Sequence, residues 1–146
     1  MKNISSKKSL EKEQHHSTDT INITLNISPR TKKNSQRIIV VHGRPMIIPS
    51  KLYKQYEKDC AWFLPHLDKP IDYPINLKCI FYMPTRRRVD LCNLQEAVCD
   101  MLVHYGILAD DNRNIVATMD GSMVLYDKKN PHTDIVISKK LDYNKW

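Results

Sequence analysis

The spacing of hydrophobic positions changes several times along this chain, and each change indicates a different element. Over residues 20–27 apolar and polar residues alternate, which predicts a half-buried strand. Residues 37–41 and 46–48 are short apolar runs on either side of a Gly-containing turn, which predicts a hairpin. A further apolar run at 75–82 is rich in β-prone residues, so we expect a central strand there.

Two other segments have helical spacing. The first begins after Ser50, a suitable N-cap, and is expected to end near Pro65. The second covers residues 90–105 and is expected to stop at Gly106. The apolar positions that define the first helix are Leu52, Tyr56, Cys60, Phe63 and Leu67.

The C-terminal third again indicates strands. A strand is predicted at 114–119, a hairpin turn at Asp120-Gly121, a return strand at 123–126 and a last strand at 133–138. This order of elements predicts a single α+β domain with one mixed β-sheet packed by two main helices. We place that domain at residues 20–146 and interpret residues 1–19, which are nearly all polar, as a disordered tail.

Composition is compatible with this picture. The chain has 146 residues and 41% hydrophobic residues, enough for one compact core. It has no apolar run long enough to span a membrane, so we expect a cytoplasmic protein. In that compartment the four cysteines are expected to be buried thiols. A zinc site from Cys92, Cys99 and His104 is a weaker alternative, because its ligands lack close pairing.

Charge is distributed unevenly over a chain whose net charge is +7. Residues 28–58 contain eight Lys or Arg and one acid, Glu57, and a run of three arginines follows at 86–88. By contrast, residues 90–111 contain five carboxylates and no Lys or Arg. Basic surface attracts nucleic acid, and clustered carboxylates repel phosphate unless a cation lies between them. This pattern is typical of a metal-dependent nuclease.

The carboxylates have a spacing that suits one site. Glu96 and Asp100 would share a face of the second helix with Asn93, and Asp90 stands at the entrance of that helix. Asp110 and Asp111 follow the return loop, so both ends of the acidic segment could reach one Mg²⁺. Taken singly, each residue also has a simpler role, as a helix cap, a turn residue or a solvated surface charge.

The segment Arg87-Arg88-Val89-Asp90-Leu91-Cys92-Asn93-Leu94-Gln95-Glu96-Ala97, followed by Asp100 and by Gly106-Ile107-Leu108-Ala109-Asp110-Asp111, resembles the central signature of the RusA family of Holliday junction resolvases. The stretches 29–34 and 43–50 resemble the family's basic loop and hairpin. The resemblance covers about residues 20–137 and assigns the metal to Asp90 and Asp111. Two positions depart from the signature: Cys92 replaces a second Asp, and Glu96 replaces a Lys. We interpret Cys92 as a packing residue and Glu96 as a carboxylate that restores the ligand count.

The resemblance implies a Mg²⁺-dependent endonuclease, with Mn²⁺ as a substitute, that resolves four-way junction DNA by paired symmetric cuts. It also implies a C2 homodimer and favours phage origin. We expect catalysis from Asp90, Asp111 and Glu96, and metal binding from those three with Asp100 and Asp110. The expected DNA-contacting residues are Lys32, Lys33, Arg44, Arg86, Arg87 and Arg88.

Three alternatives remain open. The chain could be a catalytically inactive protein that binds branched DNA, with Cys92 and Glu96 marking a lost site. It could be a nuclease for another branched or flapped substrate. An RNA-binding protein is a weaker alternative, because the sequence has no recognisable RNA-binding motif.

Overall fold

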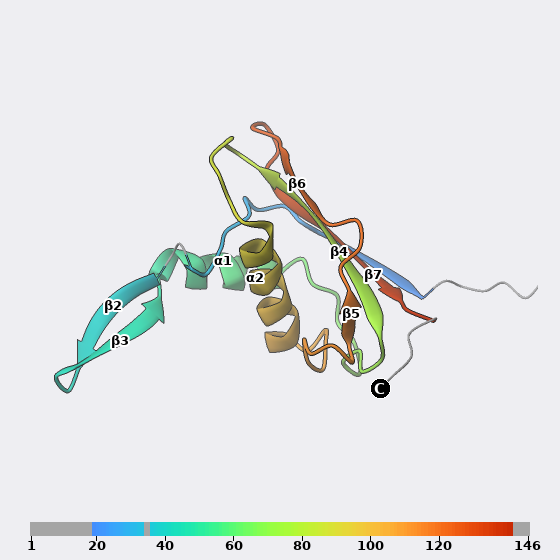
Figure 1. Ribbon diagram of the computed structural model, residues 1–146, viewed down its shortest axis with the longest axis horizontal. Helices are drawn as coiled ribbons and strands as arrows, with labels where there is room; N and C mark the ends of the chain where they lie inside the picture. Colours follow the sequence, from blue (N-terminus) through green and yellow to red (C-terminus); the bar gives the residue numbers. More distant parts are fainter. Residues whose placement is uncertain (1–18, 34–35, 142–146) are drawn as a thin grey trace, which may run out of the picture.

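The structure, a computed structural model, describes residues 19–33 and 36–141. The polar tail expected at residues 1–19 therefore lies outside the described residues apart from Asp19. The described chain forms one five-stranded sheet, two helices and a separate two-stranded hairpin (Figure 1). The α+β architecture that the sequence predicts is confirmed.

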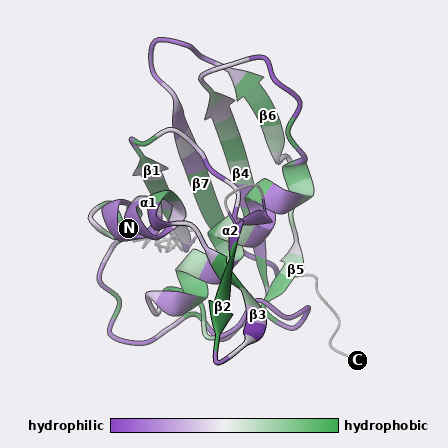
Figure 2. Ribbon diagram, turned by 90° about the vertical axis from the view of Figure 1, so that its left-hand side faces the viewer, coloured by the Kyte–Doolittle hydropathy of each residue, from purple (hydrophilic) through white to green (hydrophobic). Residues whose placement is uncertain are grey.

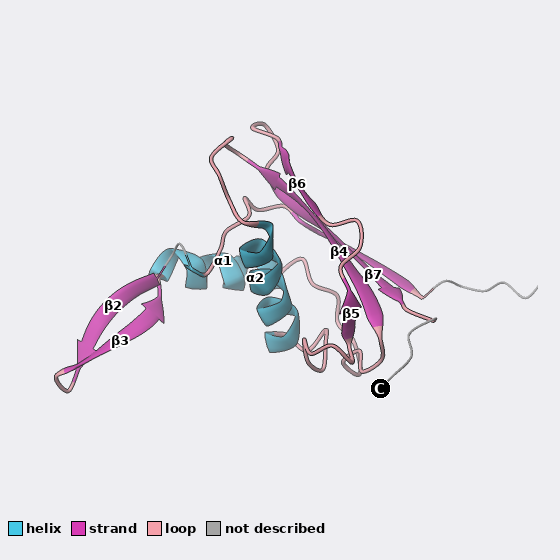
Figure 3. Cartoon of the chain, viewed as in Figure 1, coloured by secondary structure: helices cyan, strands magenta, loops and turns pink. Residues whose placement is uncertain are grey.

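The sheet is mixed, as expected. Its strands are β1 (Thr20–Leu25), β4 (Ile75–Met83), β5 (Val116–Thr118), β6 (Met123–Tyr126) and β7 (His132–Lys139). β7 pairs antiparallel with both β1 and β4, whereas β5 and β6 each pair parallel with β4. Figure 3 shows β4 crossing the middle of the sheet. This strand is the central strand that its apolar run predicts.

The hairpin predicted at Asp120-Gly121 is wrong. β5 and β6 run in the same direction along β4, one after the other, and they do not pair with each other. Side chains hold the connecting turn against the central strand. Asn76 bonds both the backbone N–H and the carbonyl of Asp120, and the Ser122 hydroxyl accepts the N–H of Cys79 at 3.0 Å. The turn therefore displaces the chain along β4 instead of reversing it.

Helix α1 (Lys51–Ala61) begins at the Ser50 cap, whose hydroxyl accepts the backbone N–H of Tyr53 at 3.1 Å. Its start agrees with the prediction, but it ends at Ala61, four residues before Pro65, and its inward face agrees only in part. The buried residues are Tyr53, Tyr56 and Cys60, whereas Leu52 is 65% exposed. Leu52 precedes Tyr53 by one position, about 100° around the helix, so only one of them can face the core.

Helix α2 (Leu91–His104) lies across one face of the sheet, with α1 beside it (Figure 1). Its buried stripe includes Leu94, Val98 and Leu102, and the facing stripe of β4 includes Leu77 and Phe81. Burial of these side chains is the main stabilising term of the domain. No helix in the described part of the chain is long and apolar enough to cross a membrane.

Strands β2 (Gln36–Val41) and β3 (Arg44–Pro49) form the predicted hairpin, with Ile38 opposite Ile47. The hairpin extends away from the rest of the molecule as an arm (Figure 1). Figure 2 shows that much of its surface is hydrophobic. Ile38 and Val40 are each 71% exposed and Ile47 is 66% exposed. The part of the chain that the structure describes leaves these side chains uncovered.

The cysteines are all free thiols, and three of them, Cys60, Cys79 and Cys99, are buried as expected. Cys92 is exposed, so its interpretation as a packing residue is wrong. It lies in the first turn of α2, on the side that faces solvent while Leu94 and Gln95 face the core. A family Asp at this position would likewise reach solvent.

Candidate active site

Helix α2 presents its carboxylates along the side that the core leaves open. Cys92, Glu96 and Asp100 follow one another at intervals of four residues, so they form one stripe along the helix. The neighbouring residues Gln95, Ala97 and Cys99 are buried and fix the rotation of the helix. The grouping of Glu96 with Asp100 that the sequence predicts is thereby supported.

The return loop brings Asp111 towards the same helix. Gly106 adopts a left-handed backbone with φ of 73°, which ends α2. The N–H groups of Ile107 and Leu108 then both bond to the carbonyl of Leu102, and Leu108 forms a parallel bridge with Ile71. Because Ile107 and Leu108 are buried, the start of the next turn is fixed beside the C-terminal half of α2.

An open pocket of about 420 Å³ lies between the 31–33 loop, the two helices and this turn. The Lys32 ammonium is 3.4 Å from Asp100 Oδ2 across the pocket. A second contact joins the helices, with His104 Nε2 at 3.8 Å from Glu57 Oε1. The pocket is lined by Lys32, Glu57, Asp100, Val103, His104 and Asp111.

The two adjacent acids of the turn have opposite environments. Both carboxylate oxygens of Asp110 accept hydrogen bonds, from the Asn112 side chain and from the backbone N–H of Asp111, and these lower its pKa. The pKa of Asp111 is raised, first by burial and then by Asp110 and Asp100. Asp110 therefore serves the turn, and Asp111 is the carboxylate directed at the pocket.

Carboxylates also gather around Cys99. Burial and, after it, the charges of Asp111, Asp100 and Glu96 together raise the pKa of this thiol to about 12. Glu57, Asp100 and Glu96 similarly raise the pKa of Tyr53, after burial. Several negative charges therefore lie around the C-terminal half of α2, where Lys32 pairs with Asp100 and His104 lies near Glu57.

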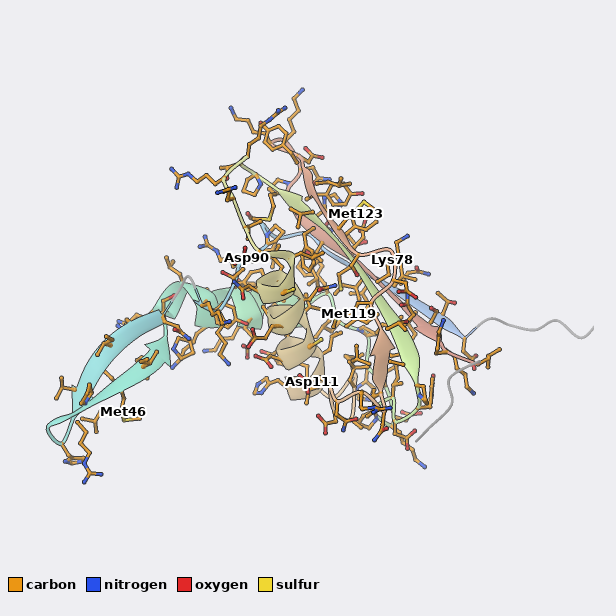
Figure 4. All side chains as sticks on the ribbon, viewed as in Figure 1. Met46, Lys78, Asp90, Asp111, Met119 and Met123 are labelled. Carbon is orange, nitrogen blue, oxygen red and sulfur yellow. The ribbon has the colours of Figure 1, made fainter. Side chains whose placement is uncertain are left out.

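Asp90 lies apart from this group. It is the N-cap residue of α2, ten positions before Asp100, which corresponds to about 15 Å along the helix. Figure 4 shows Asp90 and Asp111 at opposite ends of α2. The Asp90 carboxylate makes no capping bond and accepts one hydrogen bond, from Asn93 at 3.2 Å.

Within the described residues, no three acidic, His or Cys side chains form a ready metal cluster.

The donor set in the pocket nevertheless suits a hard cation. Mg²⁺ takes oxygen ligands and keeps several waters, so two carboxylates can hold it together with a phosphate. Asp100 and Asp111 supply two carboxylates on one side of an open pocket. The raised pKa of Asp111 indicates that its negative charge lacks sufficient compensation in the protein alone.

The predicted DNA-contacting residues divide among three places. Lys32 lines the acidic pocket and Lys33 is exposed beside it. Arg44 lies at the turn of the β2–β3 arm. Arg87 and Arg88 line a second pocket together with Arg30, near the start of α2. The Arg86 guanidinium lies 4.6 Å from the centre of the Tyr126 ring.

Comparison with known protein families matches residues 26–138 to the family of endodeoxyribonuclease RusA. The chain belongs to the RusA family. The RusA match starts at the end of β1 and reaches into β7, so it includes both helices, the arm and the acidic pocket. A search among curated proteins found no match.

Two pocket residues of this RusA chain were not predicted, Glu57 and His104. Glu57 could have been noticed, because it is the one acid within the basic stretch 28–58. Arg30, which lies with Arg87 and Arg88, could have been noticed within the basic loop. His104 was considered only as a zinc ligand, because a His in the last turn of a helix is otherwise an ordinary C-terminal residue.

Proposed function

We propose that this chain is a Mg²⁺-dependent endonuclease that resolves four-way DNA junctions by paired symmetric cuts. The observation that carries the proposal is the pocket of Asp100, Asp111 and Lys32 within a RusA family domain. The family is generally Mg²⁺-dependent and its membership implies branched DNA as substrate. Mn²⁺ is expected to substitute, since it accepts the same oxygen ligands.

Each pocket residue has a distinct task in this proposal. Asp100 and Asp111 would hold the ion, which when bound would lower the pKa of a water and stabilise charge on the leaving oxygen. Lys32 orients the Asp100 carboxylate through their 3.4 Å contact, and its ammonium offers a donor to a phosphate oxygen. Lys33 and the arginines near α2 attract the DNA backbone.

Glu96 supports the idea of a shifted ligand. It is exposed, lies one turn before Asp100 and belongs to the charges that act on Cys99. Cys92, one further turn away, is a poor Mg²⁺ ligand. We therefore infer that Glu96 supplies the carboxylate that this chain lacks at position 92.

Asp90 remains a candidate metal ligand in this proposal, although it lies at the other end of α2 from the pocket. It follows the arginine run 86–88 closely in sequence, and its carboxylate is not used to cap the helix. A site that includes both Asp90 and Asp111 would need a change in the return loop or a carboxylate from a second copy, because one ion binds its ligands at about 2 Å.

The β2–β3 arm supports the homodimer. A two-stranded hairpin is marginally stable alone, and this one exposes apolar residues on both faces, with Ile38 and Ile47 on one and Met46 on the other. Two symmetric cuts need two sites related by a two-fold axis, which a C2 dimer supplies. We therefore assign the arm to contact with a second copy of the chain.

The test is cleavage of a labelled synthetic four-way junction in Mg²⁺, in Mn²⁺ and in EDTA, beside linear duplex and flap controls. Wild type is expected to cut the junction symmetrically, only with metal. Asp111→Asn is expected to lose at least about 100-fold in rate, and Glu96→Gln about tenfold. The matched control, Asp110→Asn, removes a neighbouring carboxylate that the turn uses, so its cutting should change little.

Other outcomes would identify the alternatives. Junction binding without cutting in either metal would indicate a non-catalytic branched-DNA-binding protein. Faster cutting of the flap than of the junction would indicate a nuclease for another branched substrate. Equal rates for Glu96→Gln and wild type would contradict the shifted-ligand assignment.

A further inference from the structure

A second basic surface lies where β4 and β6 end and β7 begins. Two loops meet there, residues 84–88 and 127–131, and we call them together the sheet tip. Nitrogen-bearing side chains extend from both loops at the top of Figure 4. The tip has one acid, Asp127, and five exposed cations: Arg86, Arg87, Arg88, Lys128 and Lys129.

The two loops are joined by specific contacts although they are about 40 residues apart in sequence. The backbone N–H of Asp127 donates to the carbonyl of Met83 at 2.9 Å. Arg86 lies over the ring of Tyr126, which is 44% exposed, at 4.6 Å. A cation over an aromatic face is attracted to it, which holds the first loop against the second.

The turn that carries the lysines is itself well fixed. One carboxylate oxygen of Asp127 accepts the N–H groups of Lys129 and Asn130, each at 3.0 Å. The carbonyl of Asn130 lies 2.6 Å from His132 Nδ1, and the His132 ring stacks on Tyr82 with ring centres 4.1 Å apart. The single acid of the tip is thus engaged in the turn, and both lysines are displayed outwards.

We propose that the sheet tip binds the phosphate backbone of a duplex arm of the DNA, with Lys128 and Lys129 extending the contact that the arginine run begins. The inference rests on the proposed function and adds residues to its DNA surface. Cations that serve solubility alone are usually interspersed with acids, whereas here five occur with one acid. Phosphates are the complementary partner, because binding them releases counterions.

The position of the tip indicates which part of the DNA it contacts. It lies beyond the start of α2, to which residues 84–90 connect it, while the Asp100 and Asp111 pocket lies beside the C-terminal half of that helix (Figure 1). The 14 residues of α2 span about 21 Å. At about 3.4 Å per base pair, the tip reaches phosphates at least about six base pairs from the cut. It therefore orients an arm and takes no part in the chemistry.

The test measures binding of a labelled four-way junction and of a linear duplex in EDTA, at several salt concentrations. The variant is Lys128→Ala with Lys129→Ala. Two lost phosphate contacts should reduce the slope of log affinity against log salt by about 1.8. Between 50 and 200 mM salt, the affinity advantage of wild type over the variant should therefore shrink about tenfold.

The matched control is Lys69→Ala with Lys139→Ala, which removes the same charge. Lys139 pairs with Ile75 at the opposite end of β4. A slope that falls in the tip variant and not in the control supports the inference. Equal slopes for wild type and the tip variant, or equal losses in both variants, overturn it. Cleavage in Mg²⁺ is measured separately. A protein whose tip contributes to binding but which does not cut the junction would contradict only the nuclease proposal.

Discussion

At the scale of single residues, the acidic segment separates into groups with different tasks. Asp110 is engaged in the turn by two hydrogen bonds, whereas Asp111 faces Asp100 and has a raised pKa. The two are neighbours in sequence and have the same chemistry, so only the fold distinguishes them. The sequence could indicate that carboxylates gather here, but not which of them faces the pocket.

This difference gives a prediction on stability at pH 7. The raised pKa of Asp111 means that its contribution to stability is present at low pH and is lost as the pH rises through the folded pKa. Asp111→Asn should therefore melt at an equal or higher temperature than wild type at pH 7. The lowered pKa of Asp110 means the opposite, so Asp110→Asn should melt at a lower temperature.

The same melting curves, repeated with Mg²⁺, test the role of Asp111 in binding. Ion at 100 times its Kd would stabilise wild type by about 2.7 kcal/mol. Asp111→Asn should lose this increase, and Asp110→Asn should keep it. A Mg²⁺-induced shift that persists in Asp111→Asn would exclude Asp111 as a ligand.

At the scale of elements, local patterns predicted most of the fold. The strands at 20–27 and 75–82, the arm and both helices lie within a few residues of their predicted bounds. The error at β5 and β6 arose because Asp120-Gly121 is a hairpin signal only when nothing else binds the turn. Here the Asn76 side chain bonds Asp120, and the Ser122 hydroxyl bonds Cys79, so the turn is held by β4, a distant part of the chain. Such long-range contacts leave no mark on local periodicity.

The end of α2 depends on Gly106. Its φ of 73° is unfavourable for a residue with Cβ, although the space around it is open. Gly106→Ala should lower the free energy of unfolding in urea by about 1 kcal/mol, through backbone strain alone. Gly106→Asn should cost less, since Asn adopts this conformation more readily. Equal stability of Gly106→Ala and wild type would show that the return loop can change its path.

At the scale of the whole molecule, the chain has three separate regions that we propose face DNA, and one apolar arm. The acidic pocket and the arm lie far apart, as Figure 4 shows for Asp111 and Met46, and the sheet tip lies beyond the other end of α2. The position of Asp111 relative to Asp90 could not be predicted from sequence, because it depends on how the return loop after α2 folds. A branched substrate with several arms fits such a spread of contacts.

The arm gives a prediction for assembly. Ile38→Thr with Ile47→Thr replaces a directly opposed pair on one face and keeps β-branched residues in both strands. Wild type should be a dimer by size-exclusion chromatography with light scattering, and this variant should shift to monomer. The control, Met123→Thr with Leu125→Thr, alters two exposed apolar residues on β6 and should stay dimeric.

The outcome also affects cutting. A monomeric variant should nick one strand of a junction without the paired second cut. A wild-type protein that remains monomeric at micromolar concentration would contradict the assignment of the arm.

The exposure of Cys92 has a practical consequence. The other three thiols are buried, and burial raises the pKa of Cys60 to about 11 and that of Cys99 to about 12, which keeps them protonated and inert. A maleimide dye should therefore attach at one natural position, two residues after Asp90. The unaltered chain thus contains its own labelling point, where fluorescence could follow DNA arriving at the helix entrance in real time.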